Sequence, residues 1–208
     1  MLGTMRLVLP DLARPATVRL DPDEWLNDDE FFDLCAANPK ASFERTAEGE
    51  ILVVPPPGGV SDYRSLEVAF QLKAWAKSGG RGWVFGSTAG FSLPNGALRS
   101  PDAAWVSRAR VASQPLQRRR KAMTLCPEFV VEILSPSDRL KAAQSKMREW
   151  MANGAQLGWL IDGDRRIVHV YREGSRQRET RSGLESLAGE GPMDGFHLDL
   201  RPVWEAFH

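Results

Sequence analysis

An almost unbroken apolar run, FVVEIL at residues 129–134, places the strongest constraint on how this chain can fold. Such a run is typical of a strand that other elements cover on both faces of its sheet. Its one charge, Glu132, is costly among apolar side chains unless it is paired or binds a metal. Residues 136–154 predict a helix that Ser137 caps and Gly154 ends. A buried strand that leads into a helix predicts an α/β or α+β fold, with a mixed β-sheet flanked by helices.

The other segments alternate short strands with helices. Helices are predicted at 27–39, capped by Asn27, and at 61–80, capped by Ser61, whereas residues 108–121 predict a basic loop. Strands are predicted at 42–46, 50–54, 82–86, 90–93, 101–107, 157–162, 166–172 and 195–200. The length predicts an N-terminal arm over residues 1–24 and a single domain over residues 25–208.

The bulk composition excludes several classes of protein. Lys plus Arg and Asp plus Glu both total 27, so there is no global basic field and DNA binding has to rest on local charge. The two cysteines, Cys35 and Cys126, have no metal or redox spacing, which fits a reducing compartment. No apolar run approaches the roughly 18 residues of a membrane span, and the N-terminus lacks the pattern of a signal peptide. We therefore expect a cytoplasmic protein without a membrane partner.

Two carboxylates stand out as candidate metal ligands. Asp102 begins a predicted strand directly after Pro101, and Glu132 lies inside another strand. Acids on neighbouring strands can converge on one Mg²⁺ ion, which takes one or two carboxylates and fills its shell with water and phosphate oxygens. The backbone carbonyl of Ile133 is a candidate third ligand, and such an ion can polarise a phosphodiester. The residues alone leave simpler roles open: Asp102 as a strand-start residue, and Glu132 as a strand acid paired with an arginine.

These residues also resemble a known nuclease signature. Pro101-Asp102, followed on a later strand by Glu132-Ile133-Leu134, is similar to the PD-(D/E)XK signature. Over residues 25–205 the chain resembles more closely the Uma-two family of "putative restriction endonucleases", and the most specific match is VEILSPSD at 131–138. Further matching segments are NP at 38–39, FE at 43–44, GEI at 49–51, DAAWV at 102–106, KMREWMANG at 146–154 and WLID at 159–162. The resemblance implies a restriction-endonuclease-like fold and Mg²⁺-dependent cleavage of DNA, with Asp102 and Glu132 as metal ligands and Mn²⁺ as a substitute ion.

One position departs from the superfamily pattern, because Leu134 stands where a lysine is expected. The helix that follows offers Lys141 and Lys146, and at roughly 100° per residue Lys146 borders the core-facing stripe whereas Lys141 points into solvent. We therefore expect Lys146 to act as the relocated catalytic lysine that stabilises the charged transition state. A lysine at a helix-core boundary whose ammonium reaches solvent is the other interpretation. Leu134 also keeps a different function open: a catalytically inactive nucleic-acid-binding or regulatory module on the same fold.

Other candidate residues follow from position and charge. Glu67 on the helix at 61–80 is a candidate catalytic auxiliary, and Glu44 in the first hairpin is a further candidate acid. Both are also compatible with solvated surface positions. Nucleases of this fold often pair two sites to cut two strands, so a homodimer is expected by analogy. The predicted contacts with the DNA backbone come from a basic stretch between the two acids: Arg118, Arg119, Arg120 and Lys121.

Overall fold

The computed structural model describes residues 16–20, 25–39, 41–79, 82–136 and 138–207. A six-stranded sheet forms its centre, with the strands in the order β11-β10-β9-β8-β7-β4. The strands β8 and β9 are parallel and every other neighbouring pair is antiparallel, so the predicted mixed sheet is confirmed. In that order the strands are β11 (Glu179–Ser182), β10 (Ile167–Arg172), β9 (Leu157–Asp162), β8 (Phe129–Ile133), β7 (Ala103–Val106) and β4 (Trp83–Gly86).

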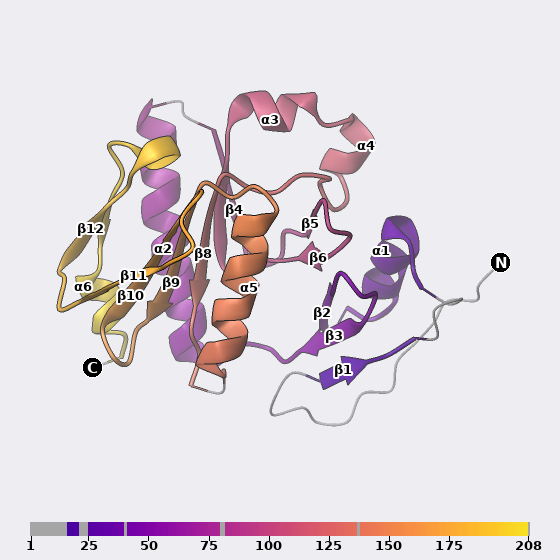
Figure 1. Ribbon diagram of the computed structural model, residues 1–208, viewed down its shortest axis with the longest axis horizontal. Coiled ribbons are helices and arrows are strands. Elements are labelled where there is room, and N and C mark those ends of the chain that lie inside the picture. Colours follow the sequence, from indigo (N-terminus) through magenta and orange to yellow (C-terminus); the bar gives the residue numbers. More distant parts are fainter. Residues whose placement is uncertain (1–15, 21–24, 40, 80–81, 137, 208) are drawn as a thin grey trace.

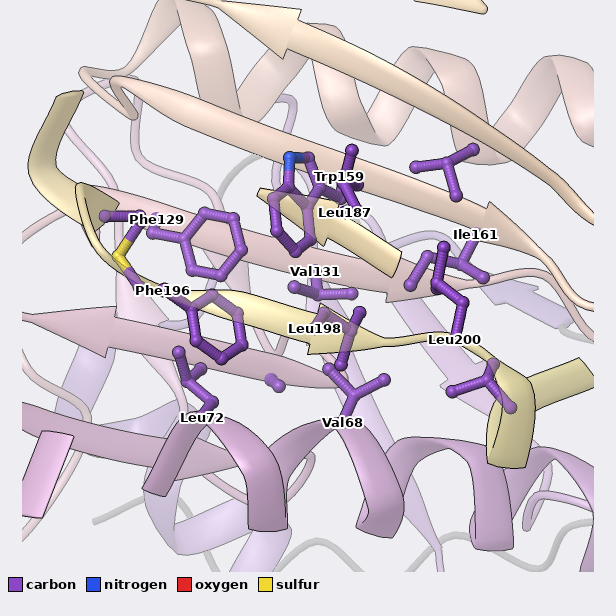
Figure 2. Close-up of a cluster of buried hydrophobic side chains, with 14 of the residues drawn as sticks. Val68, Leu72, Phe129, Val131, Trp159, Ile161, Leu187, Phe196, Leu198 and Leu200 are labelled. Carbon is purple, nitrogen blue, oxygen red and sulfur yellow. The ribbon is translucent and has the colours of Figure 1, made fainter. Parts of the chain in front are cut away.

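Two long helices cover the opposite faces of this sheet. The helix α5 (Leu140–Ala152) joins β8 to β9 and lies on one face, and α2 (Gly59–Gly79) lies on the other (Figure 1). All five residues of β8 are buried, as its apolar run predicts for a central strand. Figure 2 shows Val131 and Trp159 from the sheet together with Val68 and Leu72 from α2. The even-numbered residues of β8 point the other way and pack against α5.

A second sheet lies beside the first and has the strand order β1-β3-β2-β6-β5. Its strand β1 belongs to the predicted N-terminal arm and pairs antiparallel with β3, while residues 1–15 and 21–24 of that arm lie outside the described part of the chain. Its strands are β1 (Ala16–Val18), β3 (Ile51–Val54), β2 (Ser42–Arg45), β6 (Leu98–Arg99) and β5 (Phe91–Ser92). The helix α1 (Asp28–Ala37) packs beside this sheet, and Asn27 caps it, as predicted. The Glu30 side chain completes a capping box with Asn27.

The C-terminal part adds a small two-stranded sheet over α2. It consists of β12 (Ser186–Ala188) and β13 (His197–Asp199), which the short 3-10 helix η2 (Gly191–Met193) connects. The chain then forms the short helix α6 (Arg201–Trp204), which packs against α2. Among the described residues, no helix is both long enough and apolar enough to cross a membrane.

Three local predictions were wrong. The basic stretch is no loop but contains two short helices, α3 (Arg108–Ser113), capped by the Ser107 side chain, and α4 (Leu116–Arg119). Helix α2 begins at Gly59, before the predicted cap Ser61, because the Asp62 N–H already donates to the Gly58 carbonyl. Helix α5 begins at Leu140, with Arg139 in the N-cap position, so its start lies beyond the predicted cap Ser137, which itself falls outside the described residues. The stop at Gly154 holds, since this glycine has a φ of 109°.

Candidate active site

The candidate site lies where the two sheets meet α5. Asp102 immediately precedes β7, Glu132 is on β8, Lys146 is on α5 and Glu44 comes from β2 of the second sheet. Because successive side chains of a strand alternate between its faces, Glu132 shares with Val130 the face that α5 covers. The fold thus brings together four residues that are far apart in the sequence.

Asp102 is hydrogen-bonded to β8, the strand that carries Glu132. Its Oδ2 atom accepts a hydrogen bond of 2.6 Å from the backbone N–H of Ile133. The backbone pairing of β7 with β8 ends at Ala103 and Val131, so the Asp102 side chain bonds to β8 just beyond the ladder. In an antiparallel pair the N–H and the C=O of one residue point to the same side of its strand. The Ile133 carbonyl therefore points to the side on which the Asp102 carboxylate lies.

The charged partner of Glu132 is Lys146, and within the described part of the chain no arginine pairs with this acid. The carboxylate is buried, and its Oε1 atom lies 3.0 Å from the Lys146 ammonium. The same Oε1 atom accepts a hydrogen bond of 2.8 Å from the indole N–H of Trp150, one turn further along α5. Two residues of one helix thus fix the orientation of the Glu132 carboxylate.

Lys146 links this acid to the second sheet. Its ammonium lies 2.8 Å from Glu44 Oε1 and donates a hydrogen bond of 2.8 Å to the backbone carbonyl of Ser100. Glu44 also accepts hydrogen bonds of 3.1 Å from the Arg99 guanidinium and from the Ser100 N–H. Arg99 in turn donates to Glu149 of α5 at 2.6 Å. The result is a continuous chain of buried and half-buried charges across the junction.

The pKa values of these acids follow from burial and from an excess of negative charge. Burial raises the pKa of Glu132 to about 8; the attraction of Lys146 opposes this rise, and repulsion by Asp102 and Glu44 adds to it. Burial likewise raises the pKa of Asp102 above its ordinary value, against the opposing pull of Lys146. The pKa of Glu44 is lowered, because Lys146 and Arg99 together outweigh its burial. Burial lowers the pKa of Lys146, but Glu132 and Glu44 raise it further than burial lowers it, so the side chain remains a cation.

Comparison with known proteins adds an independent observation. A family model described as "Uma2: Putative restriction endonuclease" matches residues 28–201, which is most of the chain. The chain belongs to the Uma2 family. A solved structure described as a putative nuclease belonging to DUF820, from Anabaena variabilis ATCC 29413, is similar with a TM-score of 0.70. It is 22% identical, and the match covers 86% of this chain and 97% of that chain, which shows a shared fold. No curated protein matches this chain.

The donor set of this Uma2 chain fits a hard divalent cation. Asp102, Glu132 and the Ile133 carbonyl offer only oxygen atoms, and Mg²⁺ prefers oxygen ligands and needs only one or two carboxylates. Lys146 pairs with Glu44 and Glu132, and Asp102 is a third acid near this one ammonium, so repulsion among the three acids favours a bound cation. Within the described ranges no group of three or more His, Cys, Asp or Glu side chains is arranged to hold a metal ion. An ion bound here would therefore use two carboxylates, the backbone carbonyl and water.

The structure shows which side chains lie near the position where the nuclease signature has a lysine. Leu134 is buried in the apolar cluster beneath α5, so its side chain takes no part in the polar site. Lys146 lies beside Glu132, which is where helical geometry predicts it, and Lys141 is exposed. The catalytic role of Lys146 stays a prediction, whereas its position next to the acid is observed.

Glu67 is not part of this cluster. It lies on α2, which packs on the opposite face of the six-stranded sheet, and its Oε1 atom accepts a hydrogen bond of 2.8 Å from Gln71. Gln71 in turn donates to the backbone carbonyl of Asp199 in β13. These contacts tie Glu67 to the C-terminal sheet, and its predicted catalytic role has no geometric support here.

The basic stretch between the two acids is partly neutralised. Lys121 lies 2.8 Å from Asp29 on α1, and Arg118 approaches Asp28 and Asp29 at 3.8 and 3.9 Å. Arg119 donates to the backbone carbonyls of residues 112 and 114, next to the end of α3, and Arg120 is exposed. The predicted DNA contacts of these four side chains remain a prediction.

Sequence reasoning missed two residues of the site, Arg99 and Trp150. Helical periodicity alone predicts a core position for Trp150, and the residue does lie in the core, but its indole N–H also donates to Glu132. The signal was available, since Trp150 follows Lys146 by four residues and therefore shares its helix face. Arg99 stands three residues before Asp102 but acts through Glu44, more than 50 residues earlier, which no local pattern reveals.

Proposed function

We propose that this Uma2 chain is a metal-dependent endonuclease that hydrolyses DNA phosphodiester bonds, with Mg²⁺ as its ion and Mn²⁺ as a substitute. The observation that carries the proposal is the convergence of Asp102, Glu132 and Lys146 at the junction of the two sheets. The description of the family and that of the similar solved structure both name nucleases, which supports the same reaction.

In this proposal the chain binds and orients the reactants. Asp102, Glu132 and the Ile133 carbonyl would hold the ion, which when bound activates water and offsets negative charge on the phosphate. Trp150 keeps the Glu132 carboxylate in one orientation through its indole N–H. In the hydrolysis a water oxygen attacks phosphorus and gives up a proton to solvent, the bond from phosphorus to the leaving sugar oxygen breaks, and that oxygen takes up a proton from solvent.

Lys146 has an electrostatic role in this scheme. Its pKa is raised by Glu132 and Glu44, so at neutral pH it is a cation and cannot serve as a general base. A fixed ammonium beside the scissile phosphate would stabilise the additional negative charge of the transition state. Glu44 and the Ser100 carbonyl hold the ammonium in place before substrate arrives, so little reorganisation is needed during the reaction.

The test is cleavage of a circular plasmid, because only an endonuclease can nick a molecule without ends. We expect nicking by the wild type with Mg²⁺ or Mn²⁺, none with a chelator, and losses of at least about 100-fold in Asp102→Ala, Glu132→Ala and Lys146→Ala. Lys141→Ala is the matched control, since this exposed lysine lies on the same helix. Equal nicking by all variants would assign the activity to a contaminant and remove the proposal.

A non-catalytic nucleic-acid-binding or regulatory module is the second candidate, and one observation favours it. The three N–H donors of Lys146 all have acceptors within the protein, in Glu44, Glu132 and the Ser100 carbonyl, which is what a purely structural lysine would show. Metal-independent binding of DNA by the wild type, without any nicking, would favour this module over the nuclease.

A further inference from the structure

The outer face of α2 carries a patch of exposed apolar side chains. Leu66 and Phe70 are each 66% exposed, Tyr63 is 37% exposed, and Phe207 from the C-terminal end is 71% exposed. The rings of Tyr63 and Phe207 lie 5.4 Å apart, so Phe207 extends the row of exposed residues on the helix. Of the eight large apolar side chains that are exposed in the described residues, four belong to this patch. We call these four residues the α2 stripe.

The stripe is not required for packing within the chain. Residues 63, 66 and 70 follow the spacing of three and four that defines one helix face. Val68 and Leu72 form the opposite face and are fully buried in the core of Figure 2. Exposed apolar patches of this kind mark interaction sites. The second apolar face of α2 is therefore a surface for contact with another molecule.

The charges along α2 favour a second copy of the chain as that partner. The exposed acid Asp62 stands at the N-terminal end of the stripe, and the exposed lysines Lys73 and Lys77 stand at its C-terminal end. Two copies of α2 packed antiparallel bring the acidic end of one against the basic end of the other. A parallel arrangement would set like charges opposite one another, which is destabilising. The stripe is thus complementary to itself under a two-fold rotation.

We propose that the α2 stripe is a homodimer interface, in which two copies of α2 pack antiparallel about a two-fold axis between Leu66 and Phe70. In this register Leu66 contacts Phe70 of the partner subunit, and Asp62 lies opposite the basic end of the partner helix. Lys77 of the partner subunit then reaches the rings of Tyr63 and Phe207, and its ammonium can form a cation–π interaction with them. An interface of this kind is isologous, so each contact occurs twice.

This dimer leaves both candidate active sites open. The acids and Lys146 lie on the α5 face of the six-stranded sheet, and α2 covers the other face (Figure 1). The two sites would therefore face away from each other, and each would contain all of its residues from one copy. This proposal is independent of the proposed nuclease activity. It is tested by measuring the oligomeric state, which does not depend on catalysis.

The experiment measures the mass of the full-length chain by sedimentation velocity over a range of concentrations. We expect the wild type to sediment as a dimer, and Leu66→Glu and Phe70→Lys to have half that mass, because each places two charges in an apolar contact. Leu116→Glu on α4 is the matched control, since this leucine is 57% exposed outside the stripe and its variant should stay dimeric. Circular dichroism checks that each variant keeps the wild-type helix content.

A mixing experiment tests the register. When the Leu66→Glu and Phe70→Lys proteins are combined, one of the two symmetric contacts becomes an ion pair of Glu and Lys and the other remains Leu66 against Phe70. The mixture should therefore regain the dimer mass although neither variant forms a dimer alone. A wild type that stays monomeric at every concentration, or a dimer that survives both substitutions, would overturn the proposal. A mixture that stays monomeric would overturn the antiparallel register.

Discussion

The burial of Glu132 makes the stability of the folded chain depend on pH. The pKa of Glu132 is raised from an ordinary 4.5 to about 8, so between these values the folded chain binds a proton that the unfolded chain releases. In the absence of metal, the free energy of unfolding therefore falls as pH rises from about 4.5 to about 8, by at most about 1.4 kcal/mol per pH unit. Asp102, whose pKa is also raised, acts in the same direction.

We expect Glu132→Gln to flatten this dependence, because the amide keeps a hydrogen-bond acceptor for Trp150 and does not titrate. Urea denaturation with a chelator, at a series of pH values within the window, gives the slope for both proteins. Added Mg²⁺ should restore the stability of the wild type at the alkaline end and have less effect on the variant. A wild-type slope that equals the variant's would contradict the raised pKa of Glu132.

At the scale of single residues, the sequence predicts what depends on local context. Glu132 is conspicuous because it interrupts an apolar strand, and the position of Lys146 follows from helical periodicity. The link from Lys146 to Glu44 and on to Arg99 joins residues from two sheets, so it depends on how the sheets dock. Side-chain patterns along one segment contain no information about that docking, and for this reason Arg99 was missed.

At the scale of elements, the approach of α5 to β9 positions Lys146 and depends on a glycine. A Cβ atom at Gly158 would lie 2.4 Å from Met147 Cε and 3.4 Å from both Met151 Sδ and Val130 Cγ2. Met147 is fully buried on the same helix as Lys146, so its side chain has little room to move. The absence of a side chain at position 158 is therefore what lets α5 lie close to the sheet.

We expect Gly158→Ala to lower the free energy of unfolding by about 1–2 kcal/mol, because it overpacks this contact. It should also reduce nicking activity, since displacement of α5 moves Lys146 away from Glu132. Gly86→Ala is the matched control: Gly86 is also a strand glycine, but a Cβ atom there would meet nothing within 4 Å. Denaturant melts and plasmid nicking measure both effects, and equal stability of the two variants would show that α5 tolerates the methyl group.

The elements that the sequence predicted are those with strong periodicity or clear boundaries. The hairpins, the central strand and the three longest helices combine a regular apolar pattern with capping or turn residues. The elements that it missed are short. The three residues of β1 pair with β3, more than 30 residues away, and α3 and α4 have six and four residues, too few to show a helical period. Their structure depends on tertiary contacts that only the folded chain provides.

At the scale of the whole molecule, charge is balanced both in total and locally. Lys plus Arg equals Asp plus Glu, and the basic stretch, which lies between the two candidate acids in the sequence, contacts the acidic first turn of α1. Asp29 lies 2.8 Å from Lys121 and 3.9 Å from Arg118, so it holds two of the side chains predicted to meet the DNA backbone. These ion pairs compete with phosphate, which should make DNA binding weak and only mildly dependent on salt.

We therefore expect Asp29→Asn to strengthen DNA binding, because it frees Lys121 and loosens Arg118 for binding to phosphate. Each additional phosphate that these side chains neutralise should steepen the slope of log affinity against log salt by about 0.9 for duplex DNA. Glu185→Gln makes the same change in net charge at an exposed position next to β12, so it controls for a global effect. Fluorescence anisotropy with a labelled duplex across a salt series, without metal so that no cleavage occurs, measures both slopes. If the two variants increase in affinity equally, then net charge controls binding and the basic stretch has no special part in it.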